Sequence, residues 1–470
     1  MARAGAILSI DLGTTRCKAA VFDLRGRMLS SAWRDSKAAE GGGGDQDIAS
    51  WRRDFRWCAR RAAMAAGAEI QVIAVTGQGS TAVWLDARSR QVRPIVTHTG
   101  PRSAKQLELL ELLNREMGGL SYPAAKILPL VLWLRETDRS RFLAIRHVLD
   151  VRQFVGYDLT GELRFDRAAF TDAQRAKFAE LSGLDTGAFG DPHDYSSPVG
   201  SLTPSAAGAI GVPPGTPVFV GPMDGLCGII GSGINREGQL ADVAGTTEVM
   251  AAAVPPASGL GILPYLDTGL VLYYTSPPFG LAYKWFVDSF YAAKGDTALG
   301  QVGREAARTT TELDSPLFIP AMKSVGYHTN LEGCFVGMRP DHTRGHLARA
   351  LMECVSFELA RVVEKLAQGG AQVSEIRVSG GSAYQDAWNQ MKADVTGREV
   401  LLPRVIETSC LGAAIMAATS SSGPYASLAE GMEKMVGIGR RFRPRKAMGE
   451  LYRQRLVRYR RYGTMLEQVA

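Results

Sequence analysis

The strongest constraint on the fold is a short pattern that occurs twice, about half a chain length apart. Residues 7–22 and 240–254 each read as an apolar strand, a Gly-Thr-Thr turn and a second strand. The turn glycines, Gly13 and Gly245, predict tight β-hairpins in which the glycine takes a positive φ. A hairpin of the same kind near the start of each half predicts a duplicated unit.

A second pattern, a strand that ends at a glycine turn, also occurs once in each half. Residues 72–76 and 376–379 are rich in apolar side chains, and each run is followed directly by glycine. Such runs are typical of buried strands in an α/β sheet. Over 344–368 the apolar residues follow a helical period instead, which predicts a long helix packed on the second sheet. The sequence therefore predicts two α/β lobes, 1–236 and 237–470.

Length and cysteine usage agree with a two-domain cytoplasmic protein. A chain of 470 residues exceeds the roughly 250–300 residues at which a single hydrophobic core stops growing. Its six cysteines are scattered, with no Cys-x-x-Cys pair, which favours reduced thiols. It contains no run of about 18 apolar residues, so no membrane span is expected.

The formal net charge of +7 comes from one segment of the chain. Ten basic residues and one acid lie between Arg440 and Arg461, and the apolar side chains among them have helical spacing. A solvated basic face of a packed helix explains this segment, with binding to RNA or to a membrane surface as the alternative. We therefore expect neither a nucleic acid nor a membrane as partner.

The familiar phosphate-binding loops are absent from the sequence. No Gly-Lys pair occurs, which excludes a Walker A loop, and no Gly-x-Gly-x-x-Gly follows a strand. Backbone N–H groups and threonine hydroxyls in tight turns can bind phosphate oxygens instead. The predicted phosphate-binding residues are Gly13, Thr14, Thr15, Gly245, Thr246 and Thr247. Asp11, just before the first turn, is placed to hold Mg²⁺ directly or through water.

A second candidate acid follows the apolar strand 218–220. Asp224 stands between Gly221 and Gly225, ahead of a run of small and apolar residues typical of a closely packed helix. An Asp at this place can be only a helix cap. It can also accept the proton of a hydroxyl group during phosphoryl transfer, and the flanking glycines would let a ligand approach.

Taken together, these motifs resemble those of the FGGY carbohydrate kinases, and the resemblance covers nearly the whole chain. Residues 10–15 resemble the first phosphate motif of the family, and 245–247 resemble the second. Gln78, followed by Gly79, resembles the Gly-Gln position beside the sugar. Asp224 matches the catalytic base of the family.

The adenosine motif of the family has its counterpart in two stretches of the second half. Residues 379–382 and 388–397 resemble it, and the cofactor-binding residues that they imply are Gly380, Gly381, Ser382 and Asn389. The resemblance implies two actin-like (ribonuclease H-like) lobes with an interlobe cleft. It also implies ATP and Mg²⁺ as cofactors, an acceptor such as a pentulose (xylulose or ribulose) or a short polyol, and it allows a homodimer.

The chain departs from the family pattern where the sugar should bind. An acid that commonly precedes the family's arginine is Gly100 here, whereas Arg102 remains. His98 and Thr99 are predicted to replace the lost contacts, because both side chains can bind polyol oxygens. A Gly-Glu-Arg loop of the family is also altered around Lys323 and His328.

These departures leave alternatives to sugar phosphorylation. One is a sensor of the same fold that binds ATP and sugar without turnover. Another is an ATPase of the chaperone or filament branch of the superfamily. Intact Asp11 and Asp224 favour the kinase over the sensor, and the lack of a recognisable substrate-binding domain argues against the ATPase.

Overall fold

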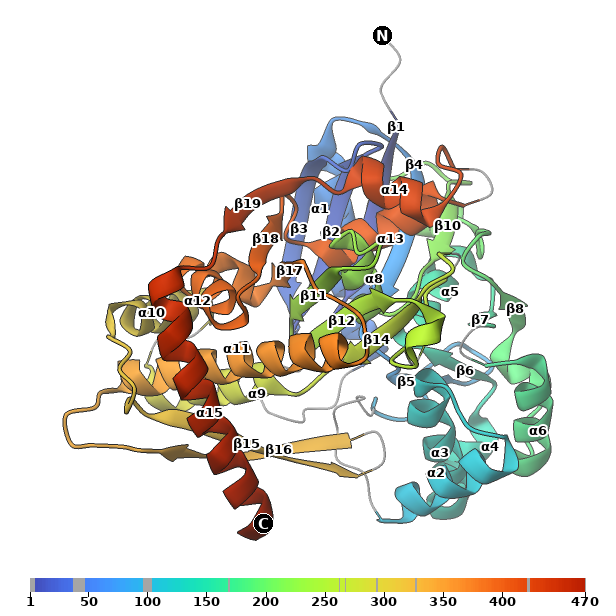
Figure 1. Cartoon of the computed structure of the whole chain (residues 1–470). Helices are drawn as coiled ribbons and strands as arrows, with labels where there is room; N and C mark the ends of the chain where they lie inside the picture. The colour runs from blue at the N-terminus through green and yellow to red at the C-terminus, as the bar shows by residue number, and fades with distance from the viewer. Residues whose placement is uncertain are drawn as a thin grey trace. The chain divides into compact units, whose positions relative to one another are not determined.

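The chain folds into two compact units (Figure 1). The computed structural model describes residues 5–36, 47–95, 104–167, 170–261, 263–266, 268–292, 295–325, 328–420 and 423–469. The first unit comprises the chain up to Gly231 together with Ser409–Met435, and the second comprises most of the remainder. The second half of the sequence therefore supplies one segment to the first unit.

The first unit is built on a six-stranded sheet whose central strands are parallel. The strand order is β3-β2-β1-β4-β10-β9. The bounds are β1 (Gly5–Leu12), β2 (Arg16–Asp23), β3 (Met28–Asp35), β4 (Glu69–Gly77), β9 (Gly200–Ser201) and β10 (Pro217–Val220). β1, β4 and β10 run parallel, and β1 and β2 form the predicted hairpin. Parallel neighbours bring their carboxyl ends to one edge of the sheet.

Alternation along β1 decides which side chains enter the core. Ala6, Leu8 and Ile10 pack in one cluster with residues of α1 (Ile48–Ala66) and α5 (Val151–Thr160). Because successive strand residues point to opposite faces, Ser9 and Asp11 face away from these two helices. Asp11 is nevertheless buried.

The rest of the first unit forms a second hydrophobic cluster. It includes Trp84, which is buried. The elements in this part are β5 (Ala82–Leu85), β6 (His147–Asp150), β7 (Arg164–Asp166), β8 (Asp191–His193), α2 (Ala104–Glu116), α3 (Tyr122–Thr137), α4 (Arg139–Ala144) and α6 (Asp172–Ser182). The helix α7 (Pro204–Ile210) instead packs in the first cluster with α1 and α5. Three further helices of this unit are α8 (Asp224–Gly231), α13 (Thr408–Ala418) and α14 (Leu428–Met435).

The second unit repeats the central arrangement of the first. Its sheet has the order β13-β14-β12-β11-β17-β18-β19. The bounds are β11 (Gln239–Ala244), β12 (Glu248–Val254), β13 (Leu263–Pro264), β14 (Val271–Thr275), β17 (Glu375–Gly380), β18 (Glu399–Pro403) and β19 (Ile438–Phe442). β11 pairs antiparallel with β12 and parallel with β17, as β1 does with β2 and β4. The shared topology agrees with the predicted duplication.

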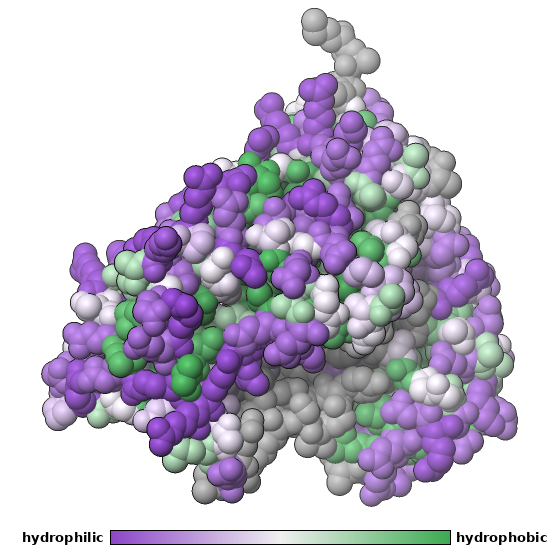
Figure 2. Space-filling view, viewed as in Figure 1, coloured by the Kyte–Doolittle hydropathy of each residue, from purple (hydrophilic) through white to green (hydrophobic). Residues whose placement is uncertain are grey.

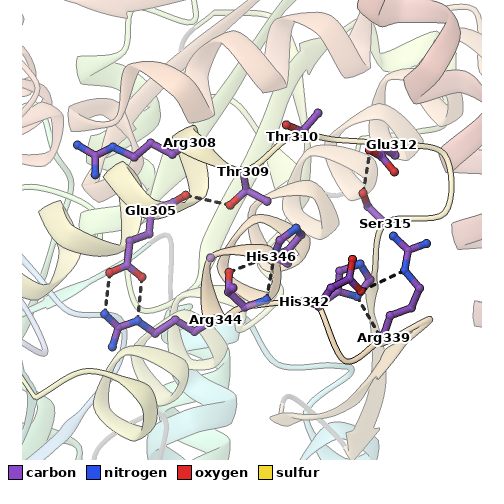
Figure 3. A pocket seen from close by; sticks show the side chains of 13 residues that line it. Glu305, Arg308, Thr309, Thr310, Glu312, Ser315, Arg339, His342, Arg344 and His346 are labelled. Carbon is purple, nitrogen blue, oxygen red and sulfur yellow. Dashed lines mark hydrogen bonds and ion pairs between the residues drawn. The ribbon is translucent and has the colours of Figure 1, made fainter.

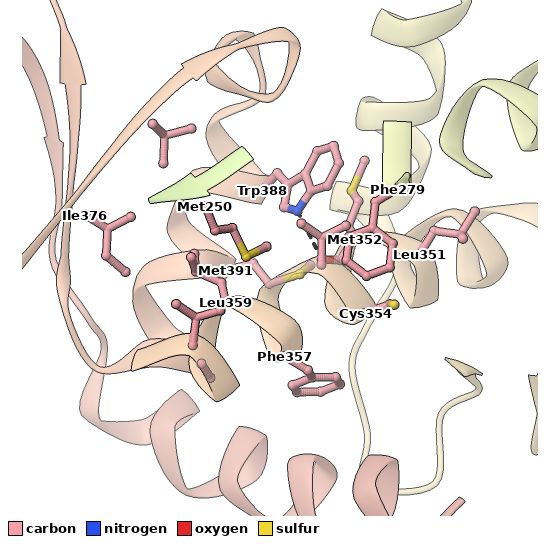
Figure 4. Close-up of a cluster of buried hydrophobic side chains, with 14 of the residues drawn as sticks. Met250, Phe279, Leu351, Met352, Cys354, Phe357, Leu359, Ile376, Trp388 and Met391 are labelled. Carbon is pink, nitrogen blue, oxygen red and sulfur yellow. Dashed lines mark hydrogen bonds between the residues drawn. The ribbon is translucent and has the colours of Figure 1, made fainter. Parts of the chain in front are cut away.

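The core of the second unit is formed around the long helix α11 (Arg344–Gln368), whose bounds equal the predicted ones. Figure 4 shows Met352 of α11 beside Trp388 of α12 (Asp386–Thr396), whose indole Nε1 donates to the Met352 carbonyl at 3.0 Å. The other elements are α9 (Phe279–Phe290), α10 (Gly295–Arg308), β15 (Leu317–Val325), β16 (His328–Val336) and α15 (Lys446–Val469).

The basic segment at the end of the chain forms α15, in agreement with the helical spacing of its apolar residues. Tyr452, Leu456 and Tyr459 are buried and join the core cluster that contains α11. Hydrophilic residues cover most of the face drawn in Figure 2. In the part of the chain that the structure describes, no helix combines the length and the apolar character needed to cross a membrane.

Candidate active site

The carboxyl ends of β1, β4 and β10 bring together three predicted site residues of the first unit. Asp11 is opposite Thr76 in the β1–β4 register, and the backbone N–H of Gln78 donates to the Leu12 carbonyl at 2.9 Å. β10 ends beside β4, where the Gly221 amide donates to the Val75 carbonyl at 2.8 Å. Asp11, Gln78 and the segment leading to Asp224 therefore share one edge of the sheet.

The first Gly-Thr-Thr turn needs glycine for a different reason from the predicted one. Gly13 is not among the glycines with a positive φ, and neither is Gly245, so that expectation was wrong. The Gly13 amide donates to the Arg16 carbonyl at 3.1 Å. A Cβ at Gly13 would lie 2.9 Å from the same oxygen. Close approach of the two chain segments, rather than backbone handedness, excludes a side chain here.

Gln78, which the sequence predicts to bind the sugar, lies in the interior of the first unit. Its side chain is fully buried, and Gly79 is buried beside it. The next residue, Ser80, has a φ of 44°, in the left-handed region. Non-glycine residues rarely adopt this conformation, and they concentrate at turns and functional sites.

Asp224 begins α8, and several hydrogen bonds fix the segment before it. The Thr76 hydroxyl donates to the Pro222 carbonyl at 2.7 Å. The Asp224 side chain accepts from the Gly225 amide at 2.8 Å, and the Ser409 hydroxyl donates to the Asp224 carbonyl at 3.1 Å. Ser409 belongs to α13, so the segment that the second half contributes to this unit supports the candidate base.

The surroundings of Asp224 favour a proton acceptor that works near neutral pH. Burial raises the pKa of Asp224 to about 6, against the opposing effects of the Gly225 amide, Arg152 and Lys18. Efficient general bases have pKa values close to the working pH. The carboxyl of Asp224 is therefore suited to accept a hydroxyl proton.

Arg152 is a neighbour of this site that the sequence did not reveal. Its side chain is buried on α5, and its Nη1 donates to the Gly221 carbonyl at 2.8 Å. Its Nε donates to Asp150 at 3.1 Å. The pattern Asp150-Val-Arg-Gln153 indicates only a capping box, which does form. A partner 69 residues away in the chain leaves no local signal.

In the second unit, two predicted turns lie side by side at the ends of β11 and β17. Ala244 pairs with Gly380, so the Gly245–Thr247 turn follows one strand where Gly380 and Gly381 follow the other. Gly380 has a φ of 74°, and a Cβ there would lie 2.2 Å from the Ala244 carbonyl oxygen. Both handedness and space thus require glycine at position 380.

The start of α9 covers the Gly245–Thr247 turn. The Leu281 amide donates to the Thr246 carbonyl at 3.1 Å. A Cβ at Gly280 would lie only 1.9 Å from the Gly245 carbonyl oxygen. The start of α9 therefore stabilises this turn, although α9 is not part of the hairpin. The repeated sequence pattern did not indicate this contact.

The side-chain amide of Asn389 stabilises the turn that follows Gly381. Its side chain is fully buried, and its Nδ2 donates to the carbonyls of Ser382, Ala383 and Gln385 at 3.3, 3.2 and 3.1 Å. These bonds shape the short helix η4 (Gly381–Tyr384). A direct contact between Asn389 and a nucleotide stays a prediction.

Several predicted substrate residues lie outside the described part of the chain. The predicted substrate residues His98, Thr99 and Arg102 fall, together with Gly100, in the stretch 96–103, which the structure does not describe. Their roles stay predictions.

A hollow of about 620 Å³ in the second unit is lined by none of the predicted site residues (Figure 3). It surrounds the start of α11, where the Arg344 guanidinium pairs with Glu305 at 2.7 Å. His342 and His346 each accept a backbone N–H at Nδ1, at 3.0 Å. Both rings thus stabilise the turn that precedes α11.

The residues that could hold a metal are few. Within the described ranges, no group of three or more His, Cys, Asp or Glu is arranged around a common point. Mg²⁺ bound with a nucleotide needs only one or two carboxylates, because phosphates and waters complete its shell. The buried carboxyl of Asp11, at the end of β1, fits that requirement.

Known proteins match this chain over almost its full length. Residues 6–231 match the N-terminal domain of the FGGY family of carbohydrate kinases, and residues 280–421 match its C-terminal domain. The chain is 27% identical over 441 residues to a probable L-xylulose kinase of Pasteurella multocida, covering 87% of this chain and 89% of that protein. It is 25% identical over 499 residues to an autoinducer-2 kinase of Klebsiella pneumoniae, covering 96% and 92%.

Solved structures support the same fold. The xylulose kinase from Rhodospirillum rubrum superposes with a TM-score of 0.77 at 23% identity, over 99% of both chains. This likeness confirms the predicted α/β class with two sheet-containing, actin-like lobes.

Proposed function

Because the chain belongs to the FGGY family of carbohydrate kinases, we propose that it transfers the terminal phosphoryl group of ATP to a hydroxyl group of a small ketose sugar or a short polyol. The observation that carries this proposal is the carboxyl of Asp224, whose pKa is raised by burial to about 6 at the start of α8. It lies at the same sheet edge as Asp11 and Gln78.

In the proposed reaction, Asp224 accepts the proton of the attacking hydroxyl group. The hydroxyl oxygen forms a bond to the terminal phosphorus of ATP while the bond from that phosphorus to the leaving oxygen of ADP breaks. The products are ADP and a phosphorylated sugar or polyol. Arg152 fixes the Gly221 carbonyl three residues before Asp224, and so orients the base.

The nucleotide is bound by backbone turns in this proposal. The Gly13–Thr15 turn of the first unit and the Gly245–Thr247 turn of the second donate N–H groups and hydroxyls to phosphate oxygens. The Gly380–Ser382 segment binds the adenosine part. Asp11 would hold Mg²⁺, which when bound neutralises charge on the phosphate oxygens.

The acceptor is proposed from the contacts in the first unit and the names of relatives. Gln78, Gly79, His98, Thr99 and Arg102 are the proposed substrate residues. Relatives are named for L-xylulose and for autoinducer-2. A pentulose is therefore the first candidate, and the altered stretch around Gly100 is where selectivity would differ.

A substrate panel tests the proposal. ADP release is measured with L-xylulose, D-xylulose, ribulose, tetritols, pentitols and autoinducer-2, each against a blank without acceptor. We expect one or a few acceptors to raise turnover by at least about 100-fold over the blank. ATP binding with no turnover on any acceptor would support the sensor alternative, and acceptor-independent turnover would support an ATPase.

The pH dependence of the preferred reaction provides a second test. Since burial raises the pKa of Asp224 to about 6, the carboxyl is protonated below that pH and cannot accept a proton. We expect kcat/KM to be constant above about pH 7 and to fall roughly tenfold per pH unit below about pH 6. The rates are measured with the coupling enzymes in excess at every pH.

Lys18→Met supplies the control for this pH profile. The Lys18 cation stabilises the carboxylate and lowers the pKa of Asp224. Removing it should move the acidic limb to higher pH, whatever its effect on the maximal rate. A profile that stays flat down to about pH 5 would contradict the assigned base.

A further inference from the structure

A fully buried lysine lies behind the two adjacent turns of the second unit. Lys392 of α12 is 0% exposed, and its Nζ lies 2.6 Å from Asp242 and 3.2 Å from Glu248. The same Nζ donates to the Ser382 hydroxyl at 2.9 Å. An ammonium group is costly to bury, so such a cluster persists only with this full set of partners.

The partners of Lys392 come from both turns. Glu248 directly follows Thr247, and Asp242 is on β11 just before the same turn. Ser382 directly follows Gly381, on the neighbouring turn. One ammonium group thus connects the two segments proposed to bind phosphate and adenosine.

The charge of the cluster suits a position behind a phosphate-binding turn. Two carboxylates and one ammonium group would sum to a negative charge, which would repel an anion. Burial, and next to it Asp242, raises the pKa of Glu248 well above its usual value, although Lys392 opposes the shift. A proton on Glu248 leaves the cluster neutral.

We propose that Lys392 is a positioning residue for the nucleotide, which sets the spacing of the Gly245–Thr247 and Gly380–Ser382 turns through Glu248, Asp242 and Ser382. The inference rests on the proposed function, because it assumes that these turns bind ATP. It assigns a role to Lys392, which does not contact the nucleotide but determines how well the two turns bind it. Without Lys392 the turns can separate, and their N–H groups no longer converge on one ligand.

Lys392→Met tests this role, with Arg445→Met as the matched control. Arg445 pairs at 2.6 Å with Asp394, a buried carboxylate on the same helix as Lys392. The side-chain hydrogen bonds of Asp394 are to Gln390 and Arg445, and none is to the partners of Lys392. Each variant removes a cation from a buried carboxylate, which is Asp242 of β11 for Lys392 and Asp394 of α12 for Arg445. Both should lower the melting temperature, but only Lys392→Met should weaken ATP binding, by about tenfold or more.

ATP affinity is measured by calorimetry on the full-length protein, beside the KM values for ATP and for the preferred acceptor. We expect Lys392→Met to raise the KM for ATP and leave the KM for the acceptor near that of the wild type. Equal ATP affinities in Lys392→Met and Arg445→Met would overturn the positioning role. If the wild type itself binds no ATP, the proposed function fails, and this inference fails with it.

A double variant keeps the test decisive if Lys392→Met does not fold. Lys392→Met with Asp242→Asn removes both opposite charges and should regain stability. Methionine still cannot bind Ser382 or Glu248, so ATP affinity should stay low. A double variant with wild-type ATP affinity would show that the cluster serves stability alone.

Discussion

Asp224→Asn is expected to lower kcat by about 10²–10⁴-fold, the usual contribution of a general base. Asparagine retains an oxygen that can accept from the Gly225 amide, the contact that the native carboxyl makes at 2.8 Å. It cannot take up the proton of the attacking hydroxyl group. Single-turnover kinetics with the preferred acceptor would measure the chemical step directly.

Binding and stability provide the control for Asp224→Asn. The affinity for ATP and the melting temperature should stay close to those of the wild type, because the local hydrogen bonds remain. Retention of more than about a tenth of wild-type kcat would show that another group accepts the proton.

Arg455→Ala is expected to have the largest effect on stability, about 3–5 kcal/mol. The guanidinium is fully buried on α15, and its Nε donates to Glu353 at 3.1 Å. It also donates to the carbonyls of Glu312, Ser315 and Pro316 at 2.7, 3.0 and 3.1 Å. Alanine removes the donor from Oε2 of the buried Glu353 and from several carbonyls, whereas Oε1 of Glu353 keeps the Thr311 hydroxyl at 3.2 Å. Native-state hydrogen exchange of α11 and α15 measures the free energy of opening.

Arg453→Ala is the matched control on the same helix. Arg453 is exposed and pairs with the exposed Glu450, so its loss should cost less than about 1 kcal/mol. Removing the carboxylate as well, in Arg455→Ala with Glu353→Gln, should recover part of the lost stability. Similar exchange rates in the Arg455 and Arg453 variants would contradict the anchoring role of Arg455.

Local patterns predicted the elements that carry the candidate site. The hairpins around Gly13 and Gly245 form as the apolar and turn residues indicated. The helix over 344–368 has the predicted bounds, because a long amphipathic period depends on neighbours three and four residues apart. These features depend on short-range geometry, which a sequence displays directly.

The physical reason why each turn requires glycine was harder to predict. Positive φ was expected at Gly13 and Gly245 and is absent, whereas Gly380 does have it. What excludes a side chain at Gly13 is the Arg16 carbonyl across the turn. A close approach of this kind depends on the path of the chain, which residue type alone does not specify.

The sequence by itself determined that the chain has two α/β lobes, that each begins with a Gly-Thr-Thr hairpin, that Asp11 is near the end of a strand and that Asp224 follows one. Only the tertiary structure decided which buried charged side chains stabilise each lobe. Arg152 reaches Gly221, and Lys392 reaches Asp242, across 69 and about 150 residues of chain. A buried cation is costly unless it finds partners in the fold, and no local pattern records which distant group will supply them.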